Sequence, residues 1–190
     1  MKKFVALLLA VLMVASLCAC GQKDTGSDLQ TVTKGKLIMS TNAEFAPYEY
    51  VADDGKGFQG TGYEGIDIEI AYALAQKLGL ELVVDNMDFD AALSAVQTGK
   101  SDMVAAGVTV TPDRLNAMSF TDSYANGVQV VIVKEGSDIK SIDDLQGKKI
   151  GTQRGTTGFL YCSDDFGDDN VIGFDDGATA VQNLKAGKID

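Results

Sequence analysis

Short apolar runs alternate with segments of helical periodicity over most of the chain. In the helical segments, apolar residues recur every three or four positions, as Ile70, Leu74 and Leu78 do. The short apolar runs between these segments predict buried strands. Strands that alternate with helices imply right-handed crossovers and a parallel sheet, so the expected fold class is α/β. The strands are expected at residues 37–39, 80–84, 103–106, 128–133, 149–152 and 171–174.

Polar residues and glycines mark where the helices begin and end. A helix is expected from Asp67 to Leu78, with Gly79 as its C-terminal cap. Asp90 is expected to cap a second helix, which ends at Gly99. The other expected elements are a turn or hairpin tip at residues 51–61, and helices at residues 141–147, from residue 157 onward and at residues 178–187.

The N-terminal segment has the pattern of an export signal. Two lysines precede an almost wholly apolar run over residues 4–17, which is shorter than the roughly 20 residues of a membrane-spanning helix. Cys20 follows this run, flanked by small residues, in a pattern that resembles the bacterial lipobox. An ordinary cleaved signal with incidental cysteines is the alternative. We expect residues 1–19 to be removed, Cys20 to carry a lipid anchor that contains palmitate, and residues 20–35 to form a tether.

Composition and charge exclude several classes of function. The 190 residues contain 16 Lys and Arg against 27 Asp and Glu, a formal net charge of −11, so no nucleic-acid partner is expected. The chain has no His, which excludes Ser-His and Cys-His nucleophile pairs and His-ligated metals. Cys18 is expected to leave with the signal and Cys20 to carry a lipid, so Cys162 has no disulfide partner and is expected to be a small buried apolar residue. No catalytic residue, metal or cofactor is expected, which favours binding over catalysis.

Four loops that follow predicted strands contain candidate ligand-binding residues. In open α/β sheets, ligands bind beyond the carboxyl ends of the strands, so these loops are expected to face one crevice. The first loop combines an amide, a carboxylate and aromatic rings, a mixture that suits a small polar ligand. In the second loop, packing at the start of a helix is an equally good explanation for the aromatic ring. The first loop contains Asn42, Glu44, Phe45, Pro47 and Tyr48, and the second contains Asp88 and Phe89.

The third loop, at residues 106–114, is the most informative. Thr111 is expected to cap a helix that has Pro112 at its first position, which places Arg114 in the first turn. A cation at the positive end of a helix is unfavourable by ~0.3–1 kcal/mol, and a nearby anion would offset this cost. The sequence therefore predicts an anionic group beside Arg114.

Two interpretations of Arg114 remain open. In the first, its guanidinium forms two parallel hydrogen bonds with a ligand carboxylate, while Thr109 and the backbone at Gly107 add donors. In the second, it is an ordinary surface residue paired with Asp113 or Asp122, which contributes little in water.

The fourth loop, at residues 153–158, also follows a strand and opens a helix. Its glycines and threonines combine free backbone N–H groups with hydroxyls, which favours an anion. It lacks the Lys-Ser/Thr ending of a phosphate-binding P-loop. Two loops from separate parts of the chain could therefore donate to the same anionic group.

These loops resemble those of the extracytoplasmic solute-binding proteins of polar amino-acid ABC transporters, bacterial family 3. The resemblance implies a type II periplasmic-binding-protein-like fold, with two α/β lobes that close on an amino acid like a hinged clamp. It also implies capture of a polar amino acid outside the cytoplasmic membrane and delivery to an ABC permease, by a lipid-anchored monomer. The resemblance extends over residues 36–190 and rests on residues 41–48, 65–70, 87–89, 106–114 and 155–157.

The same resemblance implies roles for individual side chains. Arg114 is expected to bind the α-carboxylate of the ligand, and Asp67 is expected to support the first lobe. The aromatic walls are expected from Phe45 and Phe89. The remaining residues implied to bind ligand are Ala106, Gly107, Thr109 and Thr156 near the carboxylate, Asn42, Glu44 and Gln153 at the side-chain end, and Thr157 from the second lobe.

A short, weak internal repeat includes the last residues of the sequence. The Gly-Lys-x-Asp pattern of residues 99–102 recurs at residues 187–190, yet a predicted strand follows only the first copy. We therefore expect a first lobe at residues 36–125 and an incomplete second lobe at residues 126–190, without the acidic residue that binds the ligand ammonium in the family. On this expectation residues 1–190 bind ligand weakly or not at all, and a longer form binds it. A natural C-terminus with a frayed end is the alternative.

Two other functions are compatible with the same scaffold. One is a ligand-sensing domain of a receptor, in which the clamp signals and does not deliver. The other is a dehydratase-like enzyme, for which Glu44 is the one carboxylate that the sequence places at the mouth of the first loop. Fold analogy does not separate these functions from transport.

Overall fold

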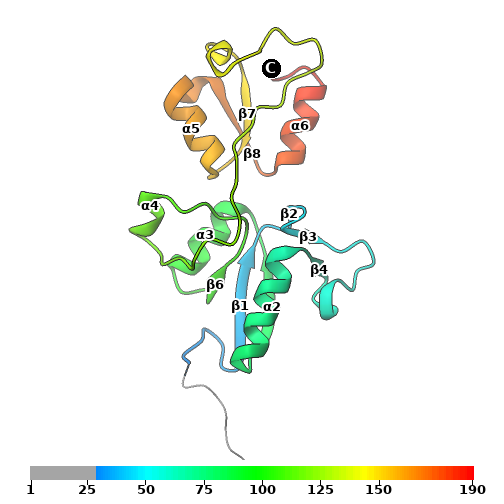
Figure 1. Ribbon diagram of the computed structural model, residues 1–190, viewed down its shortest axis with the longest axis vertical. Coiled ribbons are helices and arrows are strands. Elements are labelled where there is room, and N and C mark those ends of the chain that lie inside the picture. Colours follow the sequence, from blue (N-terminus) through cyan, green and yellow to red (C-terminus); the bar gives the residue numbers. More distant parts are fainter. Residues whose placement is uncertain (1–28) are drawn as a thin grey trace, which may run out of the picture.

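Two α/β units, called lobe 1 and lobe 2 below, lie one above the other and are joined by an extended linker (Figure 1). This computed structural model describes residues 29–190; the expected signal segment and Cys20 lie outside the described residues. Lobe 1 contains the elements from β1 (Lys36–Thr41) to α4 (Pro112–Leu115), and lobe 2 contains those from η2 (Ile142–Leu145) to α6 (Gly177–Lys185). No helix within residues 29–190 is both long enough and apolar enough to cross a membrane.

The main sheet of lobe 1 is parallel, as the alternating pattern predicts. Its central strand is β1 (Lys36–Thr41), which pairs on one side with β5 (Glu81–Asn86) and on the other with β6 (Met103–Val104). β6 is shorter than expected. Just beyond β6, the carbonyl oxygen of Ala105 accepts a hydrogen bond of 2.7 Å from the side-chain hydroxyl of Thr41.

Two helices cover the opposite faces of β1. Side chains alternate along a strand, so Met39 faces α2 (Ile66–Leu78) while Ser40 faces α3 (Phe89–Gln97). Met39 is fully buried against α2, and the hydroxyl of Ser40 donates to the carbonyl of Ala92 in α3 at 2.9 Å. α2 ends at Leu78, and Gly79 takes the left-handed conformation of a C-terminal cap, as the sequence predicts.

The start of α3 corrects one expectation. Asp88 occupies the N-cap position with extended backbone, and the expected cap, Asp90, lies inside the first helical turn. Both residues are acidic and lie near the positive end of the helix, where a carboxylate is favourable. The sequence pattern therefore predicts an acidic helix start and misses the capping residue by half a turn.

A small antiparallel sheet extends lobe 1 beside α2 (Figure 1). It contains β2 (Glu44–Phe45), β3 (Glu49–Val51) and β4 (Tyr63–Glu64), with β3 in the middle. The 3-10 helix η1 (Phe58–Gly60) lies in the connection between β3 and β4, which is the Gly- and Asp-rich segment expected to form a turn or hairpin tip. This sheet places Phe45 and Glu49 at the carboxyl end of β1.

The linker between the lobes contradicts the strand expected at residues 128–133. This segment is extended, but no strand within residues 29–190 pairs with it. Val128 is 83% exposed and Ile132 is 61% exposed, so the apolar run is not covered by the described residues. An apolar run alone does not make a strand, because a strand also needs a neighbour for its backbone hydrogen bonds.

Lobe 2 repeats the helix-on-strand arrangement on a smaller scale. β7 and β8 are parallel, and α5 and α6 flank them (Figure 1). After α6 the chain turns back toward β7, where the N–H of Asp190 donates to the carbonyl of Lys149 at 2.9 Å. The elements are η2 (Ile142–Leu145), β7 (Ile150–Gln153), α5 (Thr157–Phe166), η3 (Asp168–Asn170), β8 (Val171–Phe174) and α6 (Gly177–Lys185).

Candidate functional site

A cavity of about 520 Å³ lies between the lobes and takes residues from both. All the residues expected to bind ligand, except Glu44, line this cavity. From lobe 1 these are Asn42, Phe45, Phe89, Ala106, Gly107, Thr109 and Arg114, and from lobe 2 they are Gln153, Thr156 and Thr157.

Glu44 is the exception, and its expected place at the side-chain end of the pocket is wrong. It belongs to the same short strand as Phe45, and neighbouring side chains of a strand point to opposite faces. Phe45 lines the cavity, so Glu44 points away from it and is exposed.

Arg114 lies in α4 (Pro112–Leu115), which begins as the sequence predicts. The side chain of Thr111 accepts a hydrogen bond from the backbone N–H of Arg114 at 3.3 Å, and Pro112 takes the first helical position. The cap and the proline together fix the direction of this single helical turn. As a result Arg114 points into the cavity, where it is only 8% exposed.

The guanidinium of Arg114 has no carboxylate partner among the described residues. It donates to the carbonyl of Thr109 at 2.8 Å and, across the cleft, to the carbonyl of Gly155 at 3.0 Å. It also lies 5.6 Å from the ring centroid of Phe89, a cation–π distance. The surface-pair interpretation of Arg114 is therefore wrong. Burial lowers the pKa of Arg114, but a guanidinium remains charged at neutral pH.

The two expected aromatic walls have different surroundings. Phe89 is 8% exposed and packs beneath Arg114, whereas Phe45 is half exposed and stacks on Tyr48 at a centroid distance of 5.4 Å. Gly107 adopts a positive φ of 55°, and a Cβ there would lie 3.0 Å from the Phe45 ring. A glycine at this position therefore leaves room for the ring beside the loop.

The wall from lobe 2 is the first turn of α5. Thr156 caps this helix: its hydroxyl accepts from the N–H of Phe159 at 3.3 Å and donates to the carbonyl of Gln153 at 2.8 Å. Thr157 is 5% exposed, and its hydroxyl accepts a hydrogen bond from the Gln129 side chain at 3.2 Å. Because α5 starts at the cavity, its partial positive charge favours an anion there.

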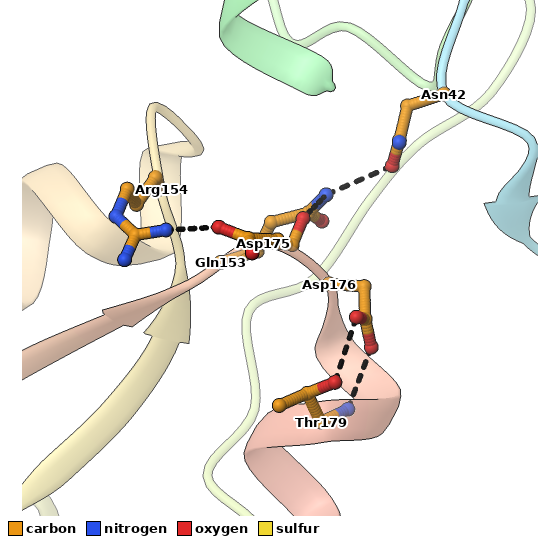
Figure 2. Close-up of polar contacts among 6 residues, drawn as sticks. All are labelled: Asn42, Gln153, Arg154, Asp175, Asp176 and Thr179. Atoms are coloured by element: carbon orange, nitrogen blue, oxygen red, sulfur yellow. Dashed lines mark hydrogen bonds and ion pairs between the residues drawn. The ribbon is translucent and has the colours of Figure 1, made fainter. Parts of the chain in front are cut away.

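Two hydrogen bonds join the lobes across the cavity. Besides the bond from Arg114 to Gly155, the amide of Gln153 donates to Oδ1 of Asn42 at 2.9 Å (Figure 2). Asn42 also donates to the carbonyl of Met87 at 3.0 Å, which ties its amide to lobe 1. The structure therefore has the lobes in contact over the site.

Residues at the ends of β7 and β8 form further hydrogen bonds and an ion pair around Gln153 (Figure 2). Gln153 donates to the backbone carbonyl of Asp175 at 3.0 Å, and Arg154 forms an ion pair with the side chain of Asp175. Asp176 caps α6 by accepting hydrogen bonds from the N–H and the hydroxyl of Thr179, at 2.6 and 2.7 Å. The bond to Asp175 thus holds the Gln153 amide at the ends of β7 and β8, where it reaches Asn42 of lobe 1.

Sequence reasoning missed Glu49, Gln129 and Tyr161, which also line the cavity. Glu49 lies within a short strand, whereas the search concerned residues that directly follow a strand. Gln129 lies in the linker segment that was expected to be a strand. Cys162 is half-buried at the cavity and not fully buried as expected, and burial raises the pKa of its thiol. Within residues 29–190, no cluster of acidic or cysteine side chains is arranged to hold a metal ion.

Gly155 offers a test of lobe closure. A Cβ at this position would collide with the carboxylate of Asp90 in lobe 1, and Gly155 has a positive φ of 71°. We expect Gly155→Ala to weaken amino-acid binding up to about tenfold in the full-length protein, because the Asp90 carboxylate must move aside before the lobes approach fully. Calorimetry measures this change.

Gly167→Ala is the matched control for this substitution. Gly167 also has a positive φ, of 82°, but a Cβ there meets no atom within 4 Å. Both variants should lose ~1 kcal/mol of stability from backbone strain, and only Gly155→Ala should lose affinity. Equal affinities of the two variants would contradict the closure argument.

Comparisons with known proteins point to one family. Residues 37–190 match the bacterial extracellular solute-binding proteins, family 3. The arginine-binding extracellular protein ArtP of Bacillus subtilis (strain 168) is 38% identical over 156 residues, which are 82% of this chain and 57% of ArtP. A probable histidine-binding protein of Neisseria gonorrhoeae is 34% identical over 194 residues, covering 100% of this chain and 70% of that protein.

The fold matches solved structures of the same kind. The arginine-bound form of a truncated ArgBP from T. maritima superimposes with a TM-score of 0.75 at 34% identity, over 84% of this chain and 73% of that one. Such structures have the type II periplasmic-binding-protein fold expected from the sequence, and this chain covers part of it. The chain therefore belongs to the bacterial extracellular solute-binding proteins of family 3.

Proposed function

We propose that the protein is the substrate-binding component of an ABC transporter, which captures a polar amino acid outside the cytoplasmic membrane and delivers it to a permease. The observation that carries this proposal is Arg114, a buried cation that lines the inter-lobe cavity without a carboxylate partner among the described residues. A buried charge without a partner is costly, and a ligand carboxylate would supply the partner.

The chemistry around Arg114 suits the α-carboxylate of an amino acid. A guanidinium has five N–H donors, and two of those of Arg114 are used by the carbonyls of Thr109 and Gly155. The remaining donors can form a fork toward a carboxylate, while the first turn of α5 offers Thr156 and Thr157 on the opposite wall. An anion between these groups would bridge the two lobes and favour the closed form.

The other end of the cavity favours a polar side chain. Asn42 and Gln153 present amides there, and Phe45 and Phe89 provide apolar walls. The relatives described above are named for arginine and histidine, two amino acids whose side chains combine apolar surface with hydrogen-bonding nitrogens. We infer that the ligand of this protein has a side chain of the same general kind.

Location and organisation follow from the same proposal. We propose that residues 1–19 direct export, that Cys20 carries a lipid that holds the protein at the membrane, and that the protein works as a monomer. We also propose a first lobe at residues 36–125 and a second lobe that begins at residue 126. The positive n-region and apolar run of the sequence support export, and the extended linker around residue 126 supports this boundary.

We infer binding and not catalysis. A dehydratase-like mechanism would use Glu44 as its acid, and this side chain lies outside the cavity. Glu49, the other carboxylate at the first wall, is buried and faces Asp67, an arrangement that suits a structural role.

A calorimetric screen of the full-length protein against the L-amino acids tests the proposal. We expect tight binding of at least one polar amino acid, with micromolar affinity or better. Absence of binding to every L-amino acid would reject the proposal. Production of a dehydrated compound from a cyclic acid would favour the enzymatic alternative instead.

A further inference from the structure

Two acidic side chains are buried next to each other beneath the inter-lobe cavity. Glu49 of β3 is 1% exposed, and Asp67 of α2 is fully buried. Both oxygens of Asp67 accept hydrogen bonds: Oδ1 from the hydroxyl of Tyr124 at 2.7 Å, and Oδ2 from the backbone N–H of Gly107 at 2.9 Å. Asp67 thus connects the pocket loop at Gly107 with the inter-lobe linker at Tyr124.

The hydrogen bonds favour Asp67 as the charged member of this pair. Asp67 accepts on both oxygens, which suits an ionised carboxylate. Oε2 of Glu49 is buried and has no hydrogen-bond partner among residues 29–190. Two adjacent buried carboxylates do not both ionise at neutral pH. Burial and the nearby charge of Asp67 raise the pKa of Glu49 to about 10. Glu49 is therefore neutral and has a proton to donate.

No Lys or Arg within residues 29–190 forms an ion pair with Glu49 or Asp67. Arg114 also lines the cavity, but its guanidinium donates to the carbonyls of Thr109 and Gly155. Burial and the hydrogen bond to Asp67 raise the pKa of the Tyr124 hydroxyl, which therefore stays protonated and donates. The titratable groups on the elements and loop packed around Glu49 are Asp67, Glu69, Tyr72 and Lys77 on α2, Glu44 on β2, Tyr63 and Glu64 on β4, Tyr48 and Tyr124.

We propose that Glu49 acts as a neutral positioning residue, whose carboxyl proton holds Asp67 so that Asp67 fixes both Gly107 in the pocket and Tyr124 in the linker. This inference rests on the proposed function, because it states how the amino-acid site is held ready for its ligand. Loss of the proton would place two negative charges under the pocket and release the loop or the linker. Amino-acid affinity should therefore require a proton or an equivalent N–H donor at residue 49.

Comparing Glu49→Gln with Glu49→Leu separates hydrogen-bond donation by residue 49 from the filling of space by its side chain. Glutamine keeps an N–H donor toward Asp67 and cannot ionise, whereas leucine removes the donor. We expect Glu49→Gln to bind within about threefold of the wild type at pH 7, and Glu49→Leu to bind at least about tenfold more weakly. The full-length protein is titrated calorimetrically with L-arginine and L-histidine at pH 6 to 9.5. Equal affinities of the Gln and Leu variants would overturn the proposal.

The pH dependence of stability gives a readout that needs no ligand. In the folded protein Glu49 keeps its proton up to a pKa of about 10, while in the unfolded chain it loses the proton near the ordinary value of 4.5. The folded state therefore binds more protons between these values, so the melting temperature of the wild type should fall as the pH rises. Glu49→Gln lacks this proton, so its melting temperature should rise relative to that of the wild type between pH 5 and pH 9.5. Parallel curves would overturn the proposal.

Tyr124→Phe covers the case in which the leucine variant does not fold. It removes only the hydroxyl that donates to Asp67 and should weaken binding about threefold to tenfold, whereas unchanged affinity would overturn the proposal. If the wild type binds neither amino acid, the proposed ligand range is rejected, and the melting curves of the wild type and Glu49→Gln still decide the proton assignment.

Discussion

Replacing Arg114 by alanine is expected to weaken amino-acid binding by about 2–5 kcal/mol, or roughly 30-fold to several thousandfold. The guanidinium is buried. It lines the inter-lobe cavity beside Thr109 and Phe89. Its removal takes away both donors of a carboxylate fork and the hydrogen bond to Gly155 across the cleft. Calorimetric titration of the full-length variant measures the loss.

Arg154→Ala is the matched control for this prediction. Arg154 also follows a strand end at the cleft, but it is exposed and pairs with Asp175. An exposed pair contributes ~0–1 kcal/mol, so Arg154→Ala should leave the affinity within about threefold of the wild type. Arg114→Ala must also keep a folded circular-dichroism spectrum for the comparison to apply. Equal affinities of the folded Arg114→Ala variant and the wild type would remove Arg114 from the site.

Ile68→Ala is expected to have the largest effect on stability. Ile68 is fully buried on α2 and packs against Met39 of the central strand β1. Removing three carbons from such a position costs the transfer energy of the removed atoms and leaves a cavity, about 2–5 kcal/mol in total. Urea denaturation of the full-length protein measures this decrease in the free energy of unfolding.

Ile70→Ala makes the same chemical change two residues further along α2. Ile70 is 41% exposed, so the expected cost is less than about 1 kcal/mol. Similar losses for both variants would contradict the packing of α2 against β1. They would place Ile70 in a core that the described residues do not form.

Local signals in the sequence predicted much of the fold. Gly79 predicted the end of α2, and Thr111 with Pro112 predicted the start of α4, because caps depend on residues within one turn. The helical spacing predicted α2 but not which side faces the sheet. Its apolar residues include the exposed Ile70 as well as the buried Ile68, and only the position of β1 decides between them.

Long-range partners could not be read from the sequence. The bond from Gln153 to Asn42 joins residues 111 positions apart, and the role of Glu49 depends on Asp67, which lies on another element. The linker run at residues 128–133 was predicted as a strand because apolar content is local, whereas strand pairing is not. The rule that ligand residues follow parallel strands predicted the cavity lining well but could not give the direction of Glu44 within β2.

A titration with amino acids and their decarboxylated counterparts tests the central claim most directly. The claim is that the inter-lobe cavity binds a polar amino acid by its α-carboxylate through Arg114. Full-length protein is titrated with L-arginine and agmatine, and with L-histidine and histamine, which differ within each pair by the carboxylate. The account predicts that at least one amino acid binds and that its amine binds at least about a hundredfold more weakly. Equal affinity for an amino acid and its amine would contradict it.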